Sequence, residues 1–395
     1  MTRLRMLTAG ESHGPELTGI LEGMPAGLKL DRDAIDRELA RRQKGFGRSG
    51  RMQIETDRAD IRSGVRFGVT LGSPITVAVM NRDWENWQER MAVWDGRDDT
   101  PVTIPRPGHA DLAGYLKFGH QNLRNVLERA SARETAVRVA LGAIVRQLLD
   151  RFGVWIGSHV IQIHAEKTEK TFLSCCDGEA NTWADTIRAL HDRAEASDLR
   201  CGDPDAAERM REAISRAQAD GDTVGGVIEV TALGAPPGLG SYVFWDTRMD
   251  ARIAAAFMSI PGIKAVDIGD GWNNAGQLGS QVHDPIMPGS KSKPARTSDH
   301  AGGIEGGITN GTPVIVRAAM KPIPTLTRPL PSVDLKTGES VSAHKERSDV
   351  CAVPAVSVVG EAMLALVLAD AFCERFGGDS VDQMINHFRT HAKTD

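Results

Sequence analysis

The predicted strands of this chain come in clusters and do not alternate strictly with helices. Turn-bounded stretches with strand character lie at residues 4–8, 18–21 and 72–80, and again at 224–230, 265–268 and 313–319. A doubly wound parallel sheet needs a helix between successive strands, so this order argues against one. The clustering favours an α+β fold.

Helices are predicted over residues 31–44, 131–152 and 356–375. In the first, Ile35 and Leu39 lie four positions apart among charged residues, and Gly45 ends the pattern. The second begins at Ser131, where the run Ser-Ala-Arg-Glu is typical of a capping box. These apolar faces supply candidate core for one large fold.

Residues 165–222 are charged and rich in alanine, and we expect a peripheral helical excursion there. The 395 residues show no fixed-period repeat and no low-complexity linker. A single domain over residues 1–395 is therefore expected.

Charge and cysteine usage exclude several classes of protein. The formal net charge is −5, whereas a dedicated nucleic-acid binder usually carries an excess of Lys and Arg. The five cysteines show no CxxC spacing and no histidines at zinc-finger distances, so we expect neither a disulfide framework nor a metal site. Any basic site must therefore be local.

No membrane association is expected either. The N-terminus lacks the apolar stretch of a signal peptide, and the longest apolar helical segment that we identify, residues 363–369, is far shorter than the ~20 residues that span a bilayer. These features predict a cytoplasmic protein in a reducing compartment.

Two motif matches fail on context. Residues 10–14 fit G-x-S-x-G, but a nucleophile elbow needs a helix directly after the serine, and Pro15 is followed by a strand-like stretch. Residues 45–50 fit G-x-G-x-x-G, but this run follows a helix instead of a strand. Neither a hydrolase nor a dinucleotide-binding fold is favoured.

A basic, glycine-rich segment is more informative. Six cations lie between residues 37 and 51: Arg37, Arg41, Arg42, Lys44, Arg48 and Arg51. For Arg37 and Arg41 a solvated helix face is the better interpretation. The glycines beside Arg48 and Arg51 allow the backbone to close around a ligand while guanidinium groups bind its phosphate or carboxylate. A small, multiply anionic substrate is the natural partner.

Two histidines occupy positions that favour chemistry over packing. His109 follows a rigid Pro-Gly turn, where an exposed imidazole titrates near neutrality, although a turn histidine without a role is the alternative. His13 lies beside Ser12 in a glycine-bounded loop after a strand. Ser131 is expected to cap a helix, and the amide donors of a helix N-terminus also attract anions.

Glycine pairs and a cation follow toward the C-terminus. Residues 302–307 contain two Gly-Gly pairs, whose backbone can approach a flat ring closely. Lys321 and Thr325 can bind a phosphate tail, and Asp349 adds a carboxylate. Structural glycine turns are the alternative interpretation.

The sequence resembles the chorismate synthase family from Gly10 to about Ala371. The resemblance rests on several ordered motifs: GESHG at 10–14, RSGRM at 48–52, RPGHAD at 106–111, RASARET at 129–135, GDTVGGV at 221–227, MSIP at 258–261 and GGI at 302–304. The chain departs from the family pattern at Ser348, where His is usual, at Val350, where Pro is usual, and at Ile323-Pro324.

The resemblance implies a β-α-β sandwich with mostly antiparallel sheets and central helices, assembled as a homotetramer. It also implies an activity, the anti-1,4-elimination of phosphate from 5-enolpyruvylshikimate 3-phosphate to give chorismate, the last common step of the shikimate pathway of aromatic amino acid biosynthesis. The family requires reduced FMN. Some relatives reduce their own flavin and others depend on a separate reductase; because no reductase-like segment is visible in the sequence, a separate flavin reductase is expected here, with NADPH as the indirect electron source.

Residue roles carry over from the motifs. His13 is expected to protonate or stabilise the departing phosphate, and His109 to protonate the reduced flavin. Asp349 is expected to accept a proton near the flavin N5, with Ser12 and Ser131 as relays. The substrate would be clamped by Arg42, Arg48, Arg51 and Arg133. FMN would be held by Arg129, Ala130, Ser131, Pro261, Gly262, Gly306, Lys321, Pro322, Ile323, Pro324, Thr325 and Arg347.

Two other classes of function stay open on the sequence alone. A flavin-binding oxidoreductase would consume NAD(P)H in proportion to its product. A non-catalytic phosphate-binding or nucleotide-binding protein would have no turnover to lose when His13 is replaced.

Overall fold

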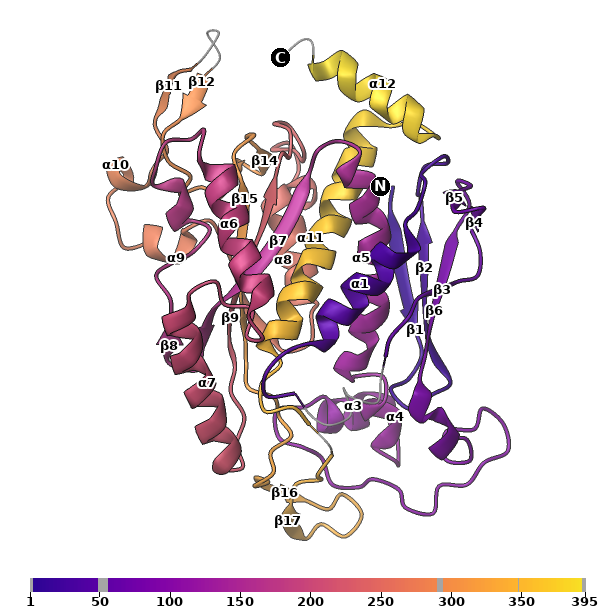
Figure 1. Ribbon diagram of the computed structural model, residues 1–395. Coiled ribbons are helices and arrows are strands. Elements are labelled where there is room, and N and C mark those ends of the chain that lie inside the picture. Colours follow the sequence, from indigo (N-terminus) through magenta and orange to yellow (C-terminus); the bar gives the residue numbers. More distant parts are fainter. Residues whose placement is uncertain (1–2, 49–55, 290–293, 347, 393–395) are drawn as a thin grey trace.

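The computed structural model describes residues 3–48, 56–289, 294–346 and 348–392. Figure 1 shows two β-sheets with helices packed between them. All strand pairs recorded for the two sheets are antiparallel. The predicted α+β sandwich with central helices is therefore confirmed.

The smaller sheet has four strands in the order β1-β2-β6-β3. Their bounds are β1 Arg5–Ala9, β2 Glu16–Glu22, β3 Asp60–Ile61 and β6 Ile75–Met80. Burial alternates along β2, so Leu17 and Leu21 face the helices while their neighbours lie on the other side. The loop between β1 and β2 carries Ser12 and His13.

The larger sheet has five strands in the order β10-β15-β9-β7-β8. Their bounds are β7 Trp155–Ile163, β8 Glu166–Lys167, β9 Gly226–Leu233, β10 Ile263–Ile268 and β15 Val314–Met320. In β9, Ile228 and Val230 join the main core, whereas Leu233 belongs to a second apolar cluster with Trp183. Both faces of this sheet are therefore covered.

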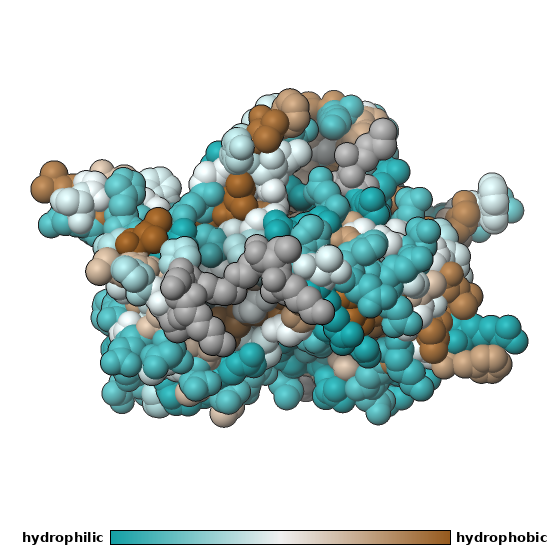
Figure 2. Space-filling view, turned by 90° about the horizontal axis from the view of Figure 1, so that it is seen from above, coloured by the Kyte–Doolittle hydropathy of each residue, from teal (hydrophilic) through white to brown (hydrophobic). Residues whose placement is uncertain are grey.

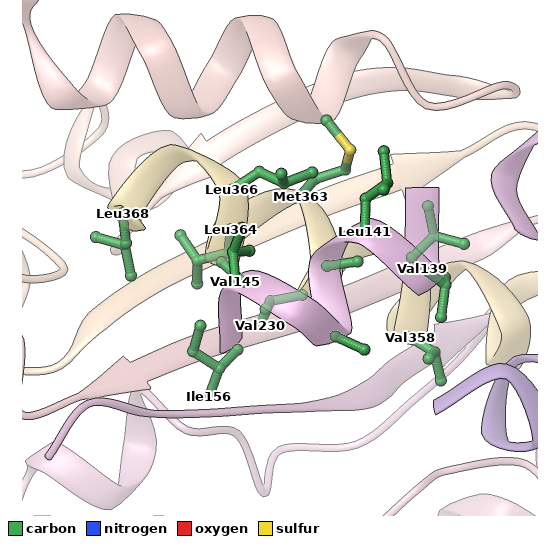
Figure 3. Close-up of a cluster of buried hydrophobic side chains, with 14 of the residues drawn as sticks. Val139, Leu141, Val145, Ile156, Val230, Val358, Met363, Leu364, Leu366 and Leu368 are labelled. Carbon is green, nitrogen blue, oxygen red and sulfur yellow. The ribbon is translucent and has the colours of Figure 1, made fainter. Parts of the chain in front are cut away.

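The central layer contains α1 Arg32–Gln43, α5 Thr135–Asp150, α8 Met249–Met258 and α11 Val353–Phe376. Helix α5 packs on β2 and β6 of the small sheet, and α11 packs on β7 and β9 of the large one. Figure 3 shows side chains of α5 and α11 meeting Ile156 and Val230 of the large sheet. The main core thus lies between the sheets, around these two helices.

The two long helices approach each other closely at Gly142 of α5. A Cβ atom on Gly142 would lie 2.4 Å from the Cβ of Ala362, closer than such atoms approach in proteins. Glycine at this point is what allows the contact. Helices α5 and α11 therefore form one tightly packed pair.

Helix α11 corrects the prediction that the longest apolar helical segment covers only residues 363–369. It has 24 residues and is long and apolar enough to cross a membrane by length and composition. Within the fold, however, 94% of its most apolar window is buried, as in the core helix of a globular protein. The face drawn in Figure 2 is mostly hydrophilic, with apolar residues scattered over it.

A buried ionic cluster joins the central layer. The carboxylate of Glu361 on α11 lies 2.7 Å from Arg41 of α1, 2.8 Å from Arg146 of α5 and 3.2 Å from Arg200. It also accepts a hydrogen bond of 2.6 Å from Ser158 of β7. Burial alone would raise the pKa of Glu361, but the three guanidinium groups hold it well below its ordinary value.

The helical excursion is less peripheral than expected. Its helices are α6 Trp183–Ala196 and α7 Pro204–Ala219, which flank the large sheet in Figure 1. Arg200, between them, enters the buried cluster. Phe46 donates its N–H to the carbonyl of Asp198 at 3.0 Å, so this region also supports the glycine-rich segment before Arg48.

The predicted capping box forms only in part. Ser131 accepts a hydrogen bond of 3.3 Å from the N–H of Arg133, as a cap should. Glu134 does not reach back to it, because its carboxylate pairs with Arg138 at 2.8 Å. A 3₁₀ turn, Ala132–Glu134, precedes α5.

The remaining elements are small. Short hairpins are formed by β4 Val65–Arg66 with β5 Val69–Thr70, β11 Ile286–Pro288 with β12 Pro294–Arg296, β13 Ile304–Glu305 with β14 Ile308–Thr309, and β16 Pro331–Val333 with β17 Ser340–Ser342. The other α-helices are α3 Asp111–Phe118, α4 Arg124–Leu127, α9 Gly271–Asn274, α10 Gly279–Val282 and α12 Val381–Ala392, and the other 3₁₀ helices are Arg82–Asn86, Ser174–Cys176 and Trp245–Thr247.

Candidate active site

A cavity of about 440 Å³ lies where the N-terminal ends of α5 and α11 meet the loops of the sandwich. Thr135, the first residue of α5, lines it, as do Ala355 and Val356 in the first turn of α11. Backbone N–H groups and helix dipoles favour negative charge at such ends. The volume is that of a small-molecule or cofactor site.

The lining is rich in charged side chains. Five cationic side chains, two imidazoles and two carboxylates contribute: Arg42, Arg48, Arg106, Arg133, Lys321, His13, His109, Glu346 and Asp349. Further carboxylates lie behind this lining and orient it, as described below. The predicted combination of arginines, His13, His109 and Asp349 thus shares one cavity.

His13 is held by Glu128. The Nδ1 of His13 lies 2.9 Å from Oε1 of Glu128, and its backbone N–H donates to Oε2 at 2.8 Å. Trp87 stacks on the imidazole with ring centroids 4.0 Å apart. Burial would raise the pKa of Glu128, yet the hydrogen bonds and charge of His13, with help from Arg124, lower it. An ionised carboxylate only accepts, so Nδ1 is the donor.

The two serines lie between the histidine loop and α5. Ser131 donates a hydrogen bond of 3.1 Å to the hydroxyl of Ser12, and both residues line the cavity. The backbone N–H of Ser12 donates to the carbonyl of Glu128 at 3.0 Å. A chain of hydroxyls therefore runs beside His13.

His109 belongs to a buried ion cluster. Its Nδ1 lies 2.5 Å from Oδ1 of Asp111, and the Nε of Arg106 lies 2.8 Å from Oδ2 of the same carboxylate. Burial would raise the pKa of Asp111, but the hydrogen bonds from His109 and Arg106 hold it well below its ordinary value. Arg106 also donates to the hydroxyl of Thr325 at 3.1 Å.

Arg42 and Arg133 share one buried counterion, Asp57. Arg133 donates to both carboxylate oxygens of Asp57 at 2.7 Å, and Arg42 lies 3.4 Å from one of them. Burial lowers the pKa of Arg42 to about 10, against the attraction of Asp57, so the group stays charged at neutral pH. Thr135 accepts a hydrogen bond of 3.0 Å from the Nε of Arg42. Both guanidinium groups are thus fixed at the cavity edge.

Arg48 and Asp349 form an ion pair of 3.2 Å although 301 positions separate them. Their loops are joined by the N–H of Val350, which donates to the carbonyl of Gly47 at 2.8 Å. A proline at position 350 has no N–H to donate, so this departure from the family pattern adds a link. Ser348, the other departure, lines the cavity.

Apolar residues also line the cavity. They are Leu127, Ile260, Met320, Ala352, Ala355, Val356 and Val359. Pro261, Gly262 and the segment from Lys321 to Thr325 line it as well. A lining that combines apolar residues with cations can hold a flat ring with an anionic tail. The Nε of Arg48 is buried and has no hydrogen-bond partner among the described residues, which leaves a donor for such a ligand.

Two expected cofactor residues are not among those that line this cavity. Gly306 lies in the β13–β14 hairpin, before β15 begins, whereas Lys321 follows the end of that seven-residue strand. A strand of this length spans roughly 20 Å, so Gly306 lies at the other end of β15 from Lys321. The guanidinium of Arg129 donates to the carbonyl of Thr8 at 2.9 Å, and Arg129 does not line the cavity, whereas its neighbour Ala130 does. The roles of Gly306 and Arg129 in FMN binding stay predictions.

Two other expected residues, Arg51 and Arg347, lie outside the described residues.

Sequence reasoning missed the residues that orient the lining. Glu128, Asp57 and Arg124 were not among the expected site residues, and Arg106 and Asp111 were noted only as neighbours of His109. Each of these residues is recognised by a buried ion pair, which exists only in the folded chain. The RPGHAD motif was the one hint in the sequence, because it contains both Arg106 and Asp111.

One group elsewhere has ligand atoms close enough for a metal. Atoms of His191, Glu195 and Glu361 lie within 4.8 Å of one another. Both carboxylates are already paired with guanidinium groups, since Arg41 contacts Glu195 at 2.5 Å and Glu361 at 2.7 Å. The group is therefore part of the structural ion cluster.

Comparisons with known proteins agree with one another. The family model described as chorismate synthase matches residues 4–373. Curated proteins named chorismate synthase are 53% identical over 392 residues in Aquifex aeolicus (98% of this chain, 97% of the relative) and 52% identical over 391 residues in Trichlorobacter lovleyi (96% of each). A solved structure titled as the crystal structure of chorismate synthase superposes with a TM-score of 0.79 at 43% identity, covering 100% of this chain and 99% of that one.

Proposed function

Because this chain belongs to the chorismate synthase family of lyases, we propose that its cavity eliminates phosphate from 5-enolpyruvylshikimate 3-phosphate to give chorismate. The substrate carries one phosphate and two carboxylates, and the product keeps both carboxylates. The observation that supports this best is the meeting of two helix N-termini with a set of arginines at one cavity. Such a site stabilises the charge that develops as phosphate leaves.

The residues divide the work between binding and proton transfer. Arg42, Arg48 and Arg133 bind the phosphate and carboxylates and hold the substrate in one orientation. His13 donates a proton to the departing phosphate, and Ser12 and Ser131 relay protons beside it. These roles use groups whose positions are already fixed by buried carboxylates.

We propose reduced FMN as the cofactor. The residues fit it: Lys321, Pro322, Ile323, Pro324 and Thr325 border the cavity with Ala130, Ser131, Pro261 and Gly262, and the apolar residues of the lining suit a flat ring. When bound, a reduced flavin supplies electron density and accepts hydrogen, which no side chain does. His109 and Asp349 would hold and move protons on the flavin side of the cavity.

Assembly and supply are also proposed from the family resemblance. The chain would act as a cytoplasmic homotetramer in the shikimate pathway of aromatic amino acid biosynthesis. It would take reduced flavin from a separate reductase that uses NADPH, since no reductase-like segment is visible in the sequence. Chorismate formation driven by NADPH with the purified protein alone would overturn that dependence.

The test is an anaerobic assay with chemically reduced FMN. We expect many phosphates released per flavin without net consumption of reductant, together with chorismate in equal amount. Reductant consumed in proportion to product would indicate an oxidoreductase, and no turnover would indicate a binding protein. His13→Ala should lower the rate by about 10²–10⁴-fold, the range for loss of a general acid.

A further inference from the structure

The His13 imidazole and three further side chains, Glu128, Arg124 and Trp87, form a closed set of contacts. Glu128 contacts Nδ1 of His13 at 2.9 Å and also accepts from Arg124 at 3.0 Å. The Arg124 guanidinium lies 4.9 Å from the Trp87 ring, and Trp87 stacks on His13. Only 2% of Glu128 is exposed, so water does not compete for its carboxylate.

This arrangement fixes which ring nitrogen faces the ligand. Glu128 occupies Nδ1, and His13 lines the cavity, so Nε2 is the nitrogen available to a bound phosphate. The second carboxylate oxygen accepts the backbone N–H of His13 at 2.8 Å, which fixes the main chain as well. Ring and backbone are therefore held by the same group.

We propose that Glu128 is a positioning residue: it keeps a proton on Nδ1 of His13 in every state, so that Nε2 alone exchanges a proton with the leaving phosphate. The inference rests on the proposed function. The Nε2–H bond breaks and an O–H bond forms on phosphate. His13 is left neutral with Nδ1–H still bound to Glu128, and solvent returns the proton to Nε2.

The charges around the pair are consistent with this role. His13 and Arg124 lower the pKa of Glu128 against the effect of burial, so the carboxylate is ionised and only accepts from Nδ1. Arg124 donates to the same Oε1 oxygen at 3.0 Å, Arg90 lies 5.4 Å from the Trp87 ring, and Glu346 lies 3.8 Å from Arg124. The cavity lining also includes Arg48 and Arg133.

The first test needs neither flavin nor substrate. Ring nitrogens of the 11 histidines are labelled with ¹⁵N, and the His13 signals are assigned by their loss in His13→Gln. Nitrogen shifts report which ring nitrogen carries a proton. We expect Nδ1–H throughout in the wild-type chain and in E128D, and a mixture with the Nε2–H tautomer in E128Q. Identical tautomers in wild type and E128Q would overturn the proposal.

The second test uses turnover with reduced FMN. E128Q should lose about 10- to 100-fold in kcat, as expected for a lost charged hydrogen bond, with a smaller change in KM. E128D keeps the anion and should recover most of the wild-type kcat, whereas E128Q should not. Equal losses of kcat in E128D and E128Q, or a loss confined to KM, would indicate a merely structural role and overturn the proposal.

Glu89→Gln is the matched control, because Glu89 is an exposed carboxylate in the segment that carries Trp87. It should change neither the ¹⁵N signals nor kcat. If the wild-type chain released no phosphate while the ¹⁵N result held, the proposed function would fail but the positioning by Glu128 would stand.

Discussion

Lys321 donates a hydrogen bond from its ammonium group to the backbone carbonyl of Gly108, 213 residues away. The bond fastens the turn that carries His109 to the segment that follows β15. A second hydrogen bond between the same two segments, from Arg106 to Thr325, is 3.1 Å long. The histidine turn and the proposed FMN-binding segment therefore form one unit.

Replacing Lys321 should weaken flavin binding and activity together. Lys321→Met removes a charge from the cavity lining and the bond to Gly108. We expect the dissociation constant of oxidised FMN to rise about 10- to 100-fold, as for the loss of one charged hydrogen bond. Fluorescence titration measures it, with Lys264→Met on the exposed side of β10 as control. Unchanged flavin affinity would remove Lys321 from the binding site.

Asp111→Asn should lower turnover by about 10- to 100-fold, because His109 loses a charged hydrogen bond at Nδ1. The pKa of Asp111 is depressed in the fold, so its stabilising effect exists above its ordinary value and disappears as pH falls through the lowered one. The melting temperature of the variant should therefore be lower than that of wild type at neutral pH and approach the wild-type value at acidic pH. Asp99→Asn replaces an exposed carboxylate and is the control; its melting temperature should equal that of wild type at neutral and at acidic pH.

Arg48→Ala should cost about 2–4 kcal/mol of transition-state stabilisation, on the order of a hundredfold in kcat/KM. The loss removes a buried guanidinium from the cavity and leaves Asp349 without this ion partner. Phosphate release under reduced FMN measures it. Arg37→Ala is the control from the same basic segment, since Arg37 is exposed and pairs only loosely with Asp31 at 3.3 Å. Equal effects of the two changes would show that Arg48 does not bind substrate.

Glu361→Gln should lower the free energy of unfolding by about 3–5 kcal/mol, because three guanidinium groups lose a shared buried counterion. The pKa of Glu361 is depressed, so the difference from wild type is complete at pH 7 and narrows as pH falls below about 4. Urea denaturation at several pH values checks both statements. On the same helix, the exposed pair of Glu374 with Arg252 is worth about 0–1 kcal/mol, so Glu374→Gln should change little.

Asp299→Asn should stabilise the fold, in contrast to Glu361→Gln. Burial raises the pKa of Asp299 to about 8, so the folded chain keeps a proton that the unfolded chain loses above pH ~4. Wild-type stability therefore falls from acid to about pH 8. The asparagine has no charge to bury, and its amide oxygen can still accept from Gly303 and Thr312. The melting temperature of the variant should exceed that of wild type at pH 8 to 9; the opposite order would show that Asp299 is ionised at no cost.

Local pattern predicted much of the fold. The i, i+4 spacing of Ile35 and Leu39 located α1, whose observed bounds are Arg32–Gln43, because apolar periodicity directly reflects a buried helix face. The strand near residues 224–230 was also found, as β9. The helix predicted over residues 356–375 was found as α11, Val353–Phe376, but its apolar stretch was taken as only residues 363–369, since charged residues such as Glu361 and Asp370 interrupt it in the sequence and are buried in the fold.

The site could be predicted only where its residues lie within recognisable sequence motifs. His13, His109 and Asp349 were singled out from their positions beside glycines and turns, their roles came from the resemblance, and the structure brings them to one cavity. Asp57 was not predicted, because no sequence periodicity identifies it. Its role is visible only in the folded chain, where it lies 2.7 Å from Arg133. The sequence order also does not show that β15 separates Gly306 from Lys321, so the role of Gly306 in cofactor binding stays a prediction.

The contact at Gly142 has a consequence for how the protein adapts to what it binds. With no side chain between α5 and Ala362, the two helices cannot slide past each other without losing their packing. The N-terminal ends of both helices frame the cavity. We therefore expect a bound ligand to be accommodated by adjustment of the loops around the cavity, with this helix pair as a fixed frame.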